Sequence, residues 1–234
     1  MVSICAALAL IGGVATGSED VTRLSDADRD AVVTRFAALQ RETRTYRADL
    51  KQTVRLRGLR EPVVSEGAVY YRRPDALAFV FATPSDEFFI VNGADTWLKK
   101  RNKPVQHRRI DPSDGASAGD MRYLLSVFQD GGGKAHERFE VEIARSGGTL
   151  RVVLTPIERH PRSREPVKIE NWVDAESLEL RGMRVEFPGN NAIEYEFANP
   201  RRNGEIAKNV FEPQEETGTN FSPRRNGDVE NSHE

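Results

Sequence analysis

The sequence predicts a mainly β protein: one antiparallel sheet of about eleven strands, curled into an unclosed barrel, with an N-terminal helix and short lid helices on its concave side. The first observation is strict alternation in the stretch 46–57, where every second residue is charged or polar. The second is that short apolar runs continue along the chain, joined by polar turns and without any repeat. We therefore expect consecutive half-buried strands that pair as a meander.

The N-terminal region predicts a secretory signal peptide followed by a helix. The apolar run 2–14 is as long as the hydrophobic part of a signal peptide and too short to cross a bilayer, and small residues follow it. We assign 1–17 to the signal peptide and 18–24 to a short linker. Ser25 and Asp28 then form the pattern of a capping box, and apolar residues recur at helical spacing up to about Gln40. This amphipathic helix is expected to pack on the sheet.

Turn and proline signals divide the rest into strands. Pro74 and Pro84 end the second and third strands, because proline lacks the amide hydrogen that a ladder needs. Asn92-Gly93 between two apolar runs predicts a tight hairpin whose two central residues adopt positive φ. The segment 103–110 alternates weakly and is expected at an exposed edge. The expected strands are 46–57, 67–71, 77–82, 88–91, 96–99, 103–110, 139–143, 150–154, 167–173, 178–187 and 192–197.

Two further segments stand apart from the strands. A short apolar helix, tucked against an opening or a core, is expected before the three glycines 131–133. The stretch 214–234 is too polar to fold, so we expect a disordered tail after a domain that spans 25–213. The apolar residues of the short helix are Met121, Tyr123, Leu124, Leu125 and Phe128.

Composition and motifs exclude several classes of function. The net charge is -2, so nothing argues for duplex nucleic acid as a partner. A single cysteine, Cys5, excludes an internal disulfide and zinc sites built from paired cysteines. The sequence has no nucleophile-elbow, metalloprotease or phosphate-loop motif, and its histidines lack metal-ligand spacing. We therefore expect neither an enzyme nor a cofactor or metal site.

Three features leave alternatives open. Glu66 and Glu87 would form a carboxylate pair, but nothing in the sequence brings them together. The basic run Arg159–Arg164 is most simply a solvated loop, with contact to anionic lipid or to a partner as the alternative. The apolar strand faces form either an ordinary core or a container for apolar ligands, and alternation alone favours the core.

Several short motifs occur in a recognisable order along the chain. They are Tyr46-x-Ala48-x-Leu50-x-Gln52, Gly67-x-Val69-Tyr70-Tyr71-Arg72-Arg73-Pro74, Val91-Asn92-Gly93-x-x-x-Trp97, the strand from Ile169 to Asp174, and Phe211-x-Pro213. In this order they resemble the LolA family of periplasmic carriers of outer-membrane lipoproteins. The resemblance covers residues 25–213, and the Arg-Pro strand end and the Gly-to-Trp hairpin are its most specific parts.

The resemblance implies a fold and a site. The family fold is an unclosed β-barrel with helices as a lid over an apolar cavity, which agrees with the interpretation of the strands. The arginine before the strand-ending proline ties the lid shut in the family, and that role would fall to Arg73. The helix from Met121 to Phe128 would be the lid. The cavity would be lined by Leu50, Val54, Val69, Tyr71, Leu77, Phe79, Phe81, Phe88 and Ile90.

The resemblance also implies a function without catalysis. The chain would accept the acyl chains of a lipoprotein from an inner-membrane ABC exporter, cross the periplasm as a monomer and deliver the cargo to an outer-membrane receptor. LolA-like proteins also carry glycolipids or other lipids, so a different lipid cargo is one alternative. A regulatory module that senses lipids is another, although this chain has no room for the second domain that such a module would need.

Overall fold

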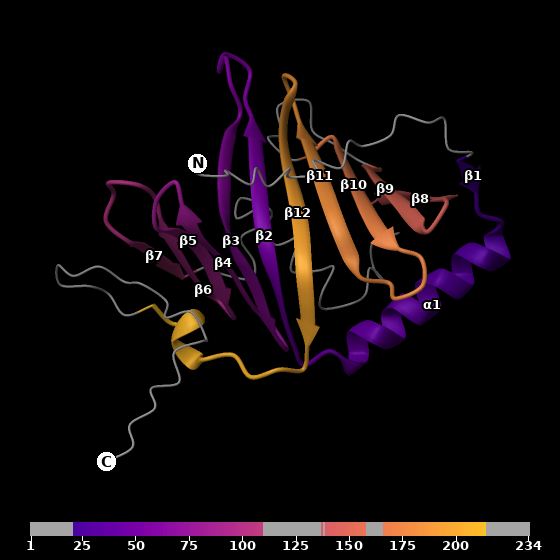
Figure 1. Cartoon of the computed structure of the whole chain (residues 1–234), viewed down its shortest axis with the longest axis horizontal. Coiled ribbons are helices and arrows are strands. Elements are labelled where there is room, and N and C mark those ends of the chain that lie inside the picture. Colours follow the sequence, from indigo (N-terminus) through magenta and orange to yellow (C-terminus); the bar gives the residue numbers. More distant parts are fainter. Residues whose placement is uncertain (1–20, 110–136, 138, 158–165, 214–234) are drawn as a thin grey trace, which may run out of the picture.

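A computed structural model describes residues 21–109, 137, 139–157 and 166–213 (Figure 1). They form one sheet with a helix beside it. The strands are β1 (Thr22–Arg23), β2 (Thr45–Arg55), β3 (Val63–Arg72), β4 (Ala76–Thr83), β5 (Glu87–Asn92), β6 (Asp95–Lys99), β7 (Gln106–Arg109), β8 (Phe139–Ser146), β9 (Thr149–Pro156), β10 (Lys168–Asp174), β11 (Leu180–Phe187) and β12 (Asn191–Arg202). The helices are α1 (Asp26–Glu42) and the 3-10 helix η1 (Lys208–Val210).

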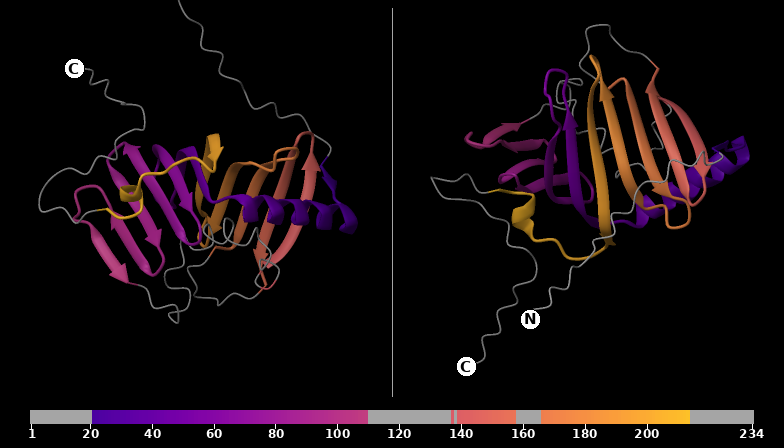
Figure 2. Two further views of the ribbon diagram at one scale, coloured as in Figure 1. Left: turned by 90° about the horizontal axis from the view of Figure 1, so that it is seen from below. Right: turned by 45° about the horizontal axis from the view of Figure 1, so that its top comes forward.

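The sheet is antiparallel and unclosed. Its strand order is β1-β8-β9-β10-β11-β12-β2-β3-β4-β5-β6-β7, so β1 and β7 are its two edges. The last strand, β12, pairs with β2 and joins two meanders, one from each half of the chain. Figure 1 and Figure 2 show these strands side by side in one twisted layer. The predicted unclosed sheet is confirmed, with 12 strands in place of about eleven, and 103–110 contains the exposed edge strand β7.

The strand that was not expected is β1. Thr22 and Arg23, which we assigned to a linker, pair with β8, and the amide of Leu24 donates to the carbonyl of Ile143 at 3.1 Å. The signal segment 1–17, the basic run Arg159–Arg164, the tail 214–234 and the proposed lid helix all lie outside the described residues. Within the described ranges, neither helix has the length and apolar content that a membrane span requires.

The start of α1 follows the sequence pattern. Ser25 Oγ accepts a hydrogen bond from the amide of Asp28 at 3.2 Å and donates to the carboxylate of Asp28 at 2.6 Å. This arrangement fixes the first turn, as expected of a hydroxyl at the cap followed three residues later by an acid. The apolar side chains of Val32, Phe36 and Leu39 then pack against the larger apolar cluster of the sheet, described below. The helix crosses the strands of the C-terminal half of the sheet (Figure 2).

The strands β2, β3 and β4 lie in the N-terminal half of the sheet, next to β12. Tyr46 and Leu50 of β2 are buried while Asp49 between them is exposed, which confirms the alternation. A bulge lies in β3 at Gly67, where the register with β4 shifts. A Cβ atom at this position would overlap the backbone carbonyl of Val80, so only glycine fits without moving a strand.

The predicted hairpin after β5 is present, but its turn is displaced by one residue. The register pairs Asn92 with Asp95, so Gly93 and Ala94 are the central residues. Gly93 has a φ of +62°, which glycine adopts without strain. The prediction of positive φ at Asn92 is wrong, because Asn92 is the last residue of β5.

The two faces of the sheet carry separate apolar clusters. The face on which α1 packs, the inner face, holds the larger cluster, which joins β2, β3 and β4 with β8 to β12. The opposite or outer face of β4 and β5 holds a smaller cluster beneath Phe211, which is fully buried. The guanidinium of Arg72 lies 4.5 Å from the centroid of the Phe211 ring, and Asn92 Nδ2 donates to the Phe211 carbonyl at 3.5 Å. Phe211, near the end of the domain, therefore packs against the outer face of β4 and β5.

Ion pairs cover the outer face of the C-terminal half. They form a ladder from β9 to β2 through Arg151–Glu170, Lys168–Glu170, Lys168–Glu186, Arg184–Glu186, Arg184–Glu194 and Arg55–Glu194. Burial of Glu170 opposes its ionisation, but hydrogen bonds from Arg151 and Lys168 outweigh burial and lower the pKa of Glu170. Each cation of this ladder is thus matched by a carboxylate on the same or the neighbouring strand.

Candidate functional site

Five of the predicted cavity residues lie together on the inner face. Leu50, Val69, Tyr71, Leu77 and Phe79 belong to the larger cluster, and each is at most 3% exposed. The register sets Val69 opposite Phe79 and Tyr71 opposite Leu77. Their side chains form a packed floor at the centre of the inner face.

A second set of apolar side chains around this floor is only half-buried. Phe81 of β4 belongs to it, and Val54 of β2 is half-buried opposite Ile193 of β12. Such side chains leave contact surface available for an apolar ligand. The other half-buried members that pack against the larger cluster from the strands are Phe89, Phe139, Val141, Val152, Leu154, Phe187 and Ile193.

Two predicted cavity residues lie on the wrong face for that role. Phe88 and Ile90 belong to the smaller cluster under Phe211, on the outer face. The register explains the correction, because Phe89 of β5 lies opposite Phe79 of β4 and therefore shares its face. A shift of one residue exchanges the faces of a strand, and this strand is apolar on both.

Arg73 is bound to the C-terminal end of α1. Its Nη2 donates to the carbonyl of Gln40 at 2.5 Å and its Nε to the carbonyl of Thr43 at 3.2 Å. Its backbone amide donates to the carbonyl of Arg44 at 2.8 Å. The last carbonyls of a helix lack partners within the helix and form the negative end of its dipole, so a guanidinium suits them. In the described part of the chain, the helix that Arg73 fastens is α1.

Arg202 completes this contact, and no sequence motif predicts its role. Its Nη1 donates to the hydroxyl of Thr43 at 2.6 Å, and its Nε and Nη2 donate to the carboxylate of Glu179 at 2.8 and 3.1 Å. The guanidinium also lies 5.3 Å from the centroid of the Tyr46 ring. We refer to Gln40, Thr43, Arg73, Glu179 and Arg202 as the α1 junction. Arg202 and Thr43 are 159 positions apart, so no local pattern links them.

Tyr46 lies beneath the α1 junction as a neutral phenol. It is 1% exposed. Burial raises the pKa of Tyr46 well above its ordinary value, and the nearby Glu179 carboxylate raises it further, against the opposing effect of Arg202. Tyr46 therefore does not change charge near neutral pH, and the guanidinium of Arg202 lies over a permanently neutral ring.

One polar side chain interrupts the inner face of the C-terminal half. Asn171 is 6% exposed and lies between Val152 of β9 and Met183 of β11. Its Oδ1 is buried, and no residue of the described structure hydrogen-bonds to it. Because this oxygen can only accept a hydrogen bond, it would suit an N–H or O–H donor of a ligand, such as an amide group. Sequence reasoning missed Asn171 because a single polar residue within an apolar strand forms no motif.

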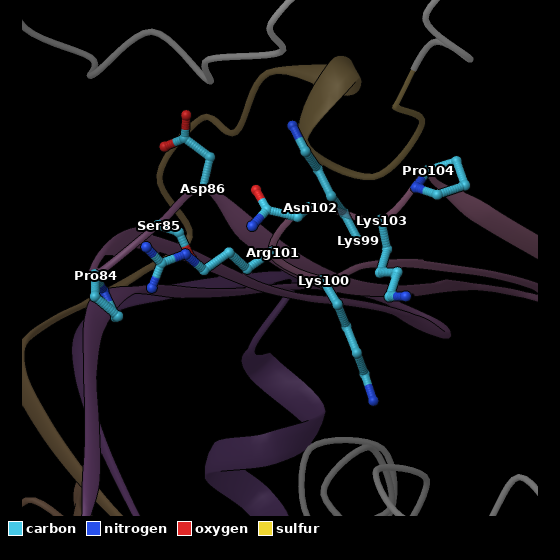
Figure 3. Close-up of a pocket in the computed structure, with 9 residues that line it drawn as sticks. All are labelled: Pro84, Ser85, Asp86, Lys99, Lys100, Arg101, Asn102, Lys103 and Pro104. Atoms are coloured by element: carbon cyan, nitrogen blue, oxygen red, sulfur yellow. The ribbon is translucent and has the colours of Figure 1, made fainter.

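Two hollows among the described residues lie apart from the predicted cavity residues. One of about 540 Å³ lies between the β4–β5 and β6–β7 turns, lined by residues 84–86 and 99–104 (Figure 3). The other, of about 200 Å³, lies at the end of the β2–β3 hairpin. The first hollow is lined by four cationic side chains and one carboxylate, so it is unsuited to an acyl chain.

One protein family matches most of this chain. Residues 41–214 match the family described as "Outer membrane lipoprotein carrier protein LolA". The comparison with curated proteins gives no match.

Several solved structures are similar at low sequence identity. A DUF1329 family protein from Desulfovibrio piger has a TM-score of 0.47 at 13% identity, over 78% of this chain and 95% of that one. A LolA superfamily protein from Nitrosomonas europaea has a TM-score of 0.39 at 10% identity, over 77% and 96%. The lipoprotein LppX of Mycobacterium tuberculosis has a TM-score of 0.45 at 14% identity, over 78% and 99%. Because the family model matches most of the sequence, from residue 41 to residue 214, this protein belongs to the LolA family.

Proposed function

We propose that this protein carries lipoproteins through the periplasm by holding their acyl chains against the inner face of the sheet. The observation that carries the proposal is the set of half-buried apolar side chains that pack against the larger cluster beside the packed floor. The description of the LolA family as lipoprotein carriers supports it. If cargo passes from the carrier to an acceptor that binds it more tightly, the transfer needs neither a catalytic group nor a cofactor.

The inner face offers enough apolar contact to hold an acyl chain in water. Each CH₂ removed from water contributes about 0.8 kcal/mol, so a chain of about twelve contributes roughly 10 kcal/mol before the entropic cost of binding. Phe81 and Val54 would touch the chain directly, because they keep exposed surface. Leu50, Leu77 and Phe79 would support them from below, because they are almost fully buried.

The α1 junction suits a gate that opens and closes around cargo. Arg73 holds the end of α1 by hydrogen bonds, each worth on the order of 1 kcal/mol net. The gain from acyl-chain burial exceeds that cost, so cargo would displace the end of the helix. The segment from Met121 to Phe128 is a second proposed cover, on the strength of the family resemblance.

The proposed route begins at an inner-membrane ABC exporter and ends at an outer-membrane receptor. The protein would travel between them as a monomer with the lipid tails shielded from water. Such a carrier must bind less tightly than its acceptor, so an easily reversed gate is of more use than maximal affinity.

Native mass spectrometry of the protein from a periplasmic extract tests the cargo. A co-purifying acylated polypeptide is the expected result. A free lipid or glycolipid in its place would change the cargo and keep the carrier role. An empty protein that also fails to take up a synthetic diacylated peptide would refute the proposal.

A matched pair of variants on β4 tests the location of the site. Phe81→Ser removes an apolar side chain from the inner face, and Val80→Ser makes a comparable change on the outer face of the same strand. We expect Phe81→Ser to weaken uptake of the diacylated peptide about tenfold or more, since a fully buried Phe contributes roughly 1.5–3 kcal/mol. Val80→Ser should bind like the parent. Equal losses in the two folded variants would place the site elsewhere.

A further inference from the structure

The end of the β2–β3 hairpin exposes large apolar side chains to solvent. Leu56 and Leu59 in the turn are 47% and 51% exposed, and Val63 and Val64 at the start of β3 are 44% and 43% exposed. The hairpin projects beyond the neighbouring strands at one end of the sheet (Figure 1). These four side chains lie within nine residues, and Val63 and Val64 point to opposite faces of β3, so the hairpin end is apolar on both sides. Exposed apolar side chains gathered in this way are typical of an interaction site.

Two exposed arginines lie in the same turn as these apolar side chains. Arg57 and Arg60 are exposed, and among the described residues neither forms a salt bridge. On the outer face of the C-terminal half, by contrast, Arg151, Lys168 and Arg184 each form an ion pair with a carboxylate. The hairpin end is therefore cationic in excess, with Glu61 as the one acid within the turn 56–62.

A second cationic turn lies at the same end of the sheet. The antiparallel order β2-β3-β4-β5-β6-β7 sets the β2–β3, β4–β5 and β6–β7 turns at one end. Lys100, Arg101 and Lys103 of the β6–β7 turn point in different directions around the hollow, whose lining also includes Asp86 (Figure 3). Among the described residues none of the three is in an ion pair.

Two hydrogen bonds stabilise the backbone at the hairpin end. The amide of Arg57 donates to Asn191 Oδ1 of the neighbouring β11–β12 turn at 2.8 Å. The amide of Leu59 donates to the carbonyl of Leu56 at 3.1 Å, which closes the turn around Gly58 at a φ of +98°. Both bonds use backbone amides of the turn, so they leave the side chains of Leu56 and Leu59 exposed to water.

We propose that this end of the sheet is a docking surface for an anionic lipid bilayer. The leucines of the hairpin would enter the boundary between headgroups and acyl chains, while Arg57, Arg60 and the β6–β7 turn contact anionic headgroups. Apolar side chains beside lysine and arginine are the combination that binds such interfaces. A carrier that docks in this way meets its donor and acceptor by diffusion in the plane of the membrane.

A bilayer fits these residues better than a protein partner. Specific protein interfaces bury at least about 1,000 Å² and are centred on a packed apolar core. The apolar part here is the tip of one hairpin, and the cations are spread over two separate turns. Charge complementarity to a surface that is uniformly negative does not require the precise pairing that a protein interface does.

Flotation of the cargo-free protein with lipid vesicles tests the proposal independently of the carrier function. The parent should float with vesicles that contain phosphatidylglycerol and not with vesicles of phosphatidylcholine alone, and high salt should release it. Leu56→Ser/Leu59→Ser and Arg57→Glu/Arg60→Glu should each reduce the bound fraction about tenfold or more. Arg145→Glu/Lys208→Glu makes the same change in net charge at exposed positions away from the hairpin, and it should float like the parent.

The opposite results overturn the proposal. A parent protein that stays in solution with anionic vesicles refutes membrane docking, even if it takes up diacylated peptide normally. If the hairpin and control variants lose vesicle binding equally, net charge alone explains the binding, and a specific docking surface is refuted. If vesicle binding is absent but the hairpin variants lose cargo transfer from a reconstituted donor, the hairpin contacts a protein instead. Circular dichroism confirms that each variant is folded.

Discussion

Replacing Arg73 by leucine should loosen the end of α1 and make the protein retain its cargo. The substitution removes the bonds from the guanidinium to the carbonyls of Gln40 and Thr43, at 2.5 and 3.2 Å. Hydrogen bonds to a charged group contribute about 1.5–3 kcal/mol each when buried, and Arg73 is exposed, so we expect about 2 kcal/mol for the pair. That corresponds to roughly a 30-fold increase in opening of the helix end.

The free energy that Arg73 contributes to holding the helix end closed would also oppose the binding of cargo. In the proposed gate, the bonds of Arg73 would stabilise the closed, empty protein, so their loss would favour the open, loaded state by the same factor. Arg73→Leu should therefore fold and load like the parent but release its cargo to an acceptor about tenfold or more slowly. Arg73→Lys, which offers a point charge in place of a fork, should fall between the two.

Hydrogen exchange and a transfer assay measure the two effects. The amide of Thr43, which donates to the carbonyls of Leu39 and Gln40, should lose protection in Arg73→Leu. Arg72→Leu is the control, since its guanidinium lies over Phe211 on the outer face and not at the α1 junction. Unchanged protection at Thr43 together with transfer at the parent rate would refute the role assigned to Arg73, as would an unfolded variant.

Three further predictions test the sheet and its charges. Gly67→Ala should destabilise the protein by about 2–4 kcal/mol in urea unfolding, because its Cβ would overlap the Val80 carbonyl, whereas Gly148→Ala, with open space around it, should change stability by less than about 0.5 kcal/mol. Asn171→Leu should raise the stability by about 1 kcal/mol, since it removes a buried polar atom without a partner in the described structure, and a lower melting temperature would reveal a hidden partner. Hydrogen bonds to Asp174 from the Ser177 backbone and hydroxyl lower the pKa of Asp174 from 3.8 to about 2. Its contribution is therefore present above pH 3.8 and lost as the pH falls toward 2, so Asp174→Asn should flatten the stability profile in that window, and an unchanged slope would contradict the assignment.

The sequence was most informative where one face of a strand is polar. In β2 the alternation of apolar and charged residues specifies which side is buried, and Tyr46 and Leu50 are buried as expected. In β5 the run Phe88 to Val91 is apolar throughout, so the sequence contains no information on which residues face inward. Long-range pairing with β4 decides that question, and it selects Phe89 for the inner face.

The residues of the candidate site also differ in how far the sequence could predict them. Arg73 could be singled out because it belongs to a local motif before a strand-ending proline. Arg202 and Glu179 could not, because their contact depends on how β11, β12 and α1 meet in space. Asn171 is a third case, since its significance arises from the lack of a hydrogen-bond partner for Oδ1 within the described structure, a property that only coordinates reveal.

The strand β4 divides two tasks between its alternate residues. Leu77 and Phe79 face the side where cargo would rest, while Ala76 and Ala78 are sealed against Phe211 on the reverse. Much of what keeps this region assembled is thus out of reach of any bound molecule. Pocket preferences could be re-engineered on one side of such a wall, by libraries at Phe81 and its half-buried neighbours, with the scaffold still anchored from behind.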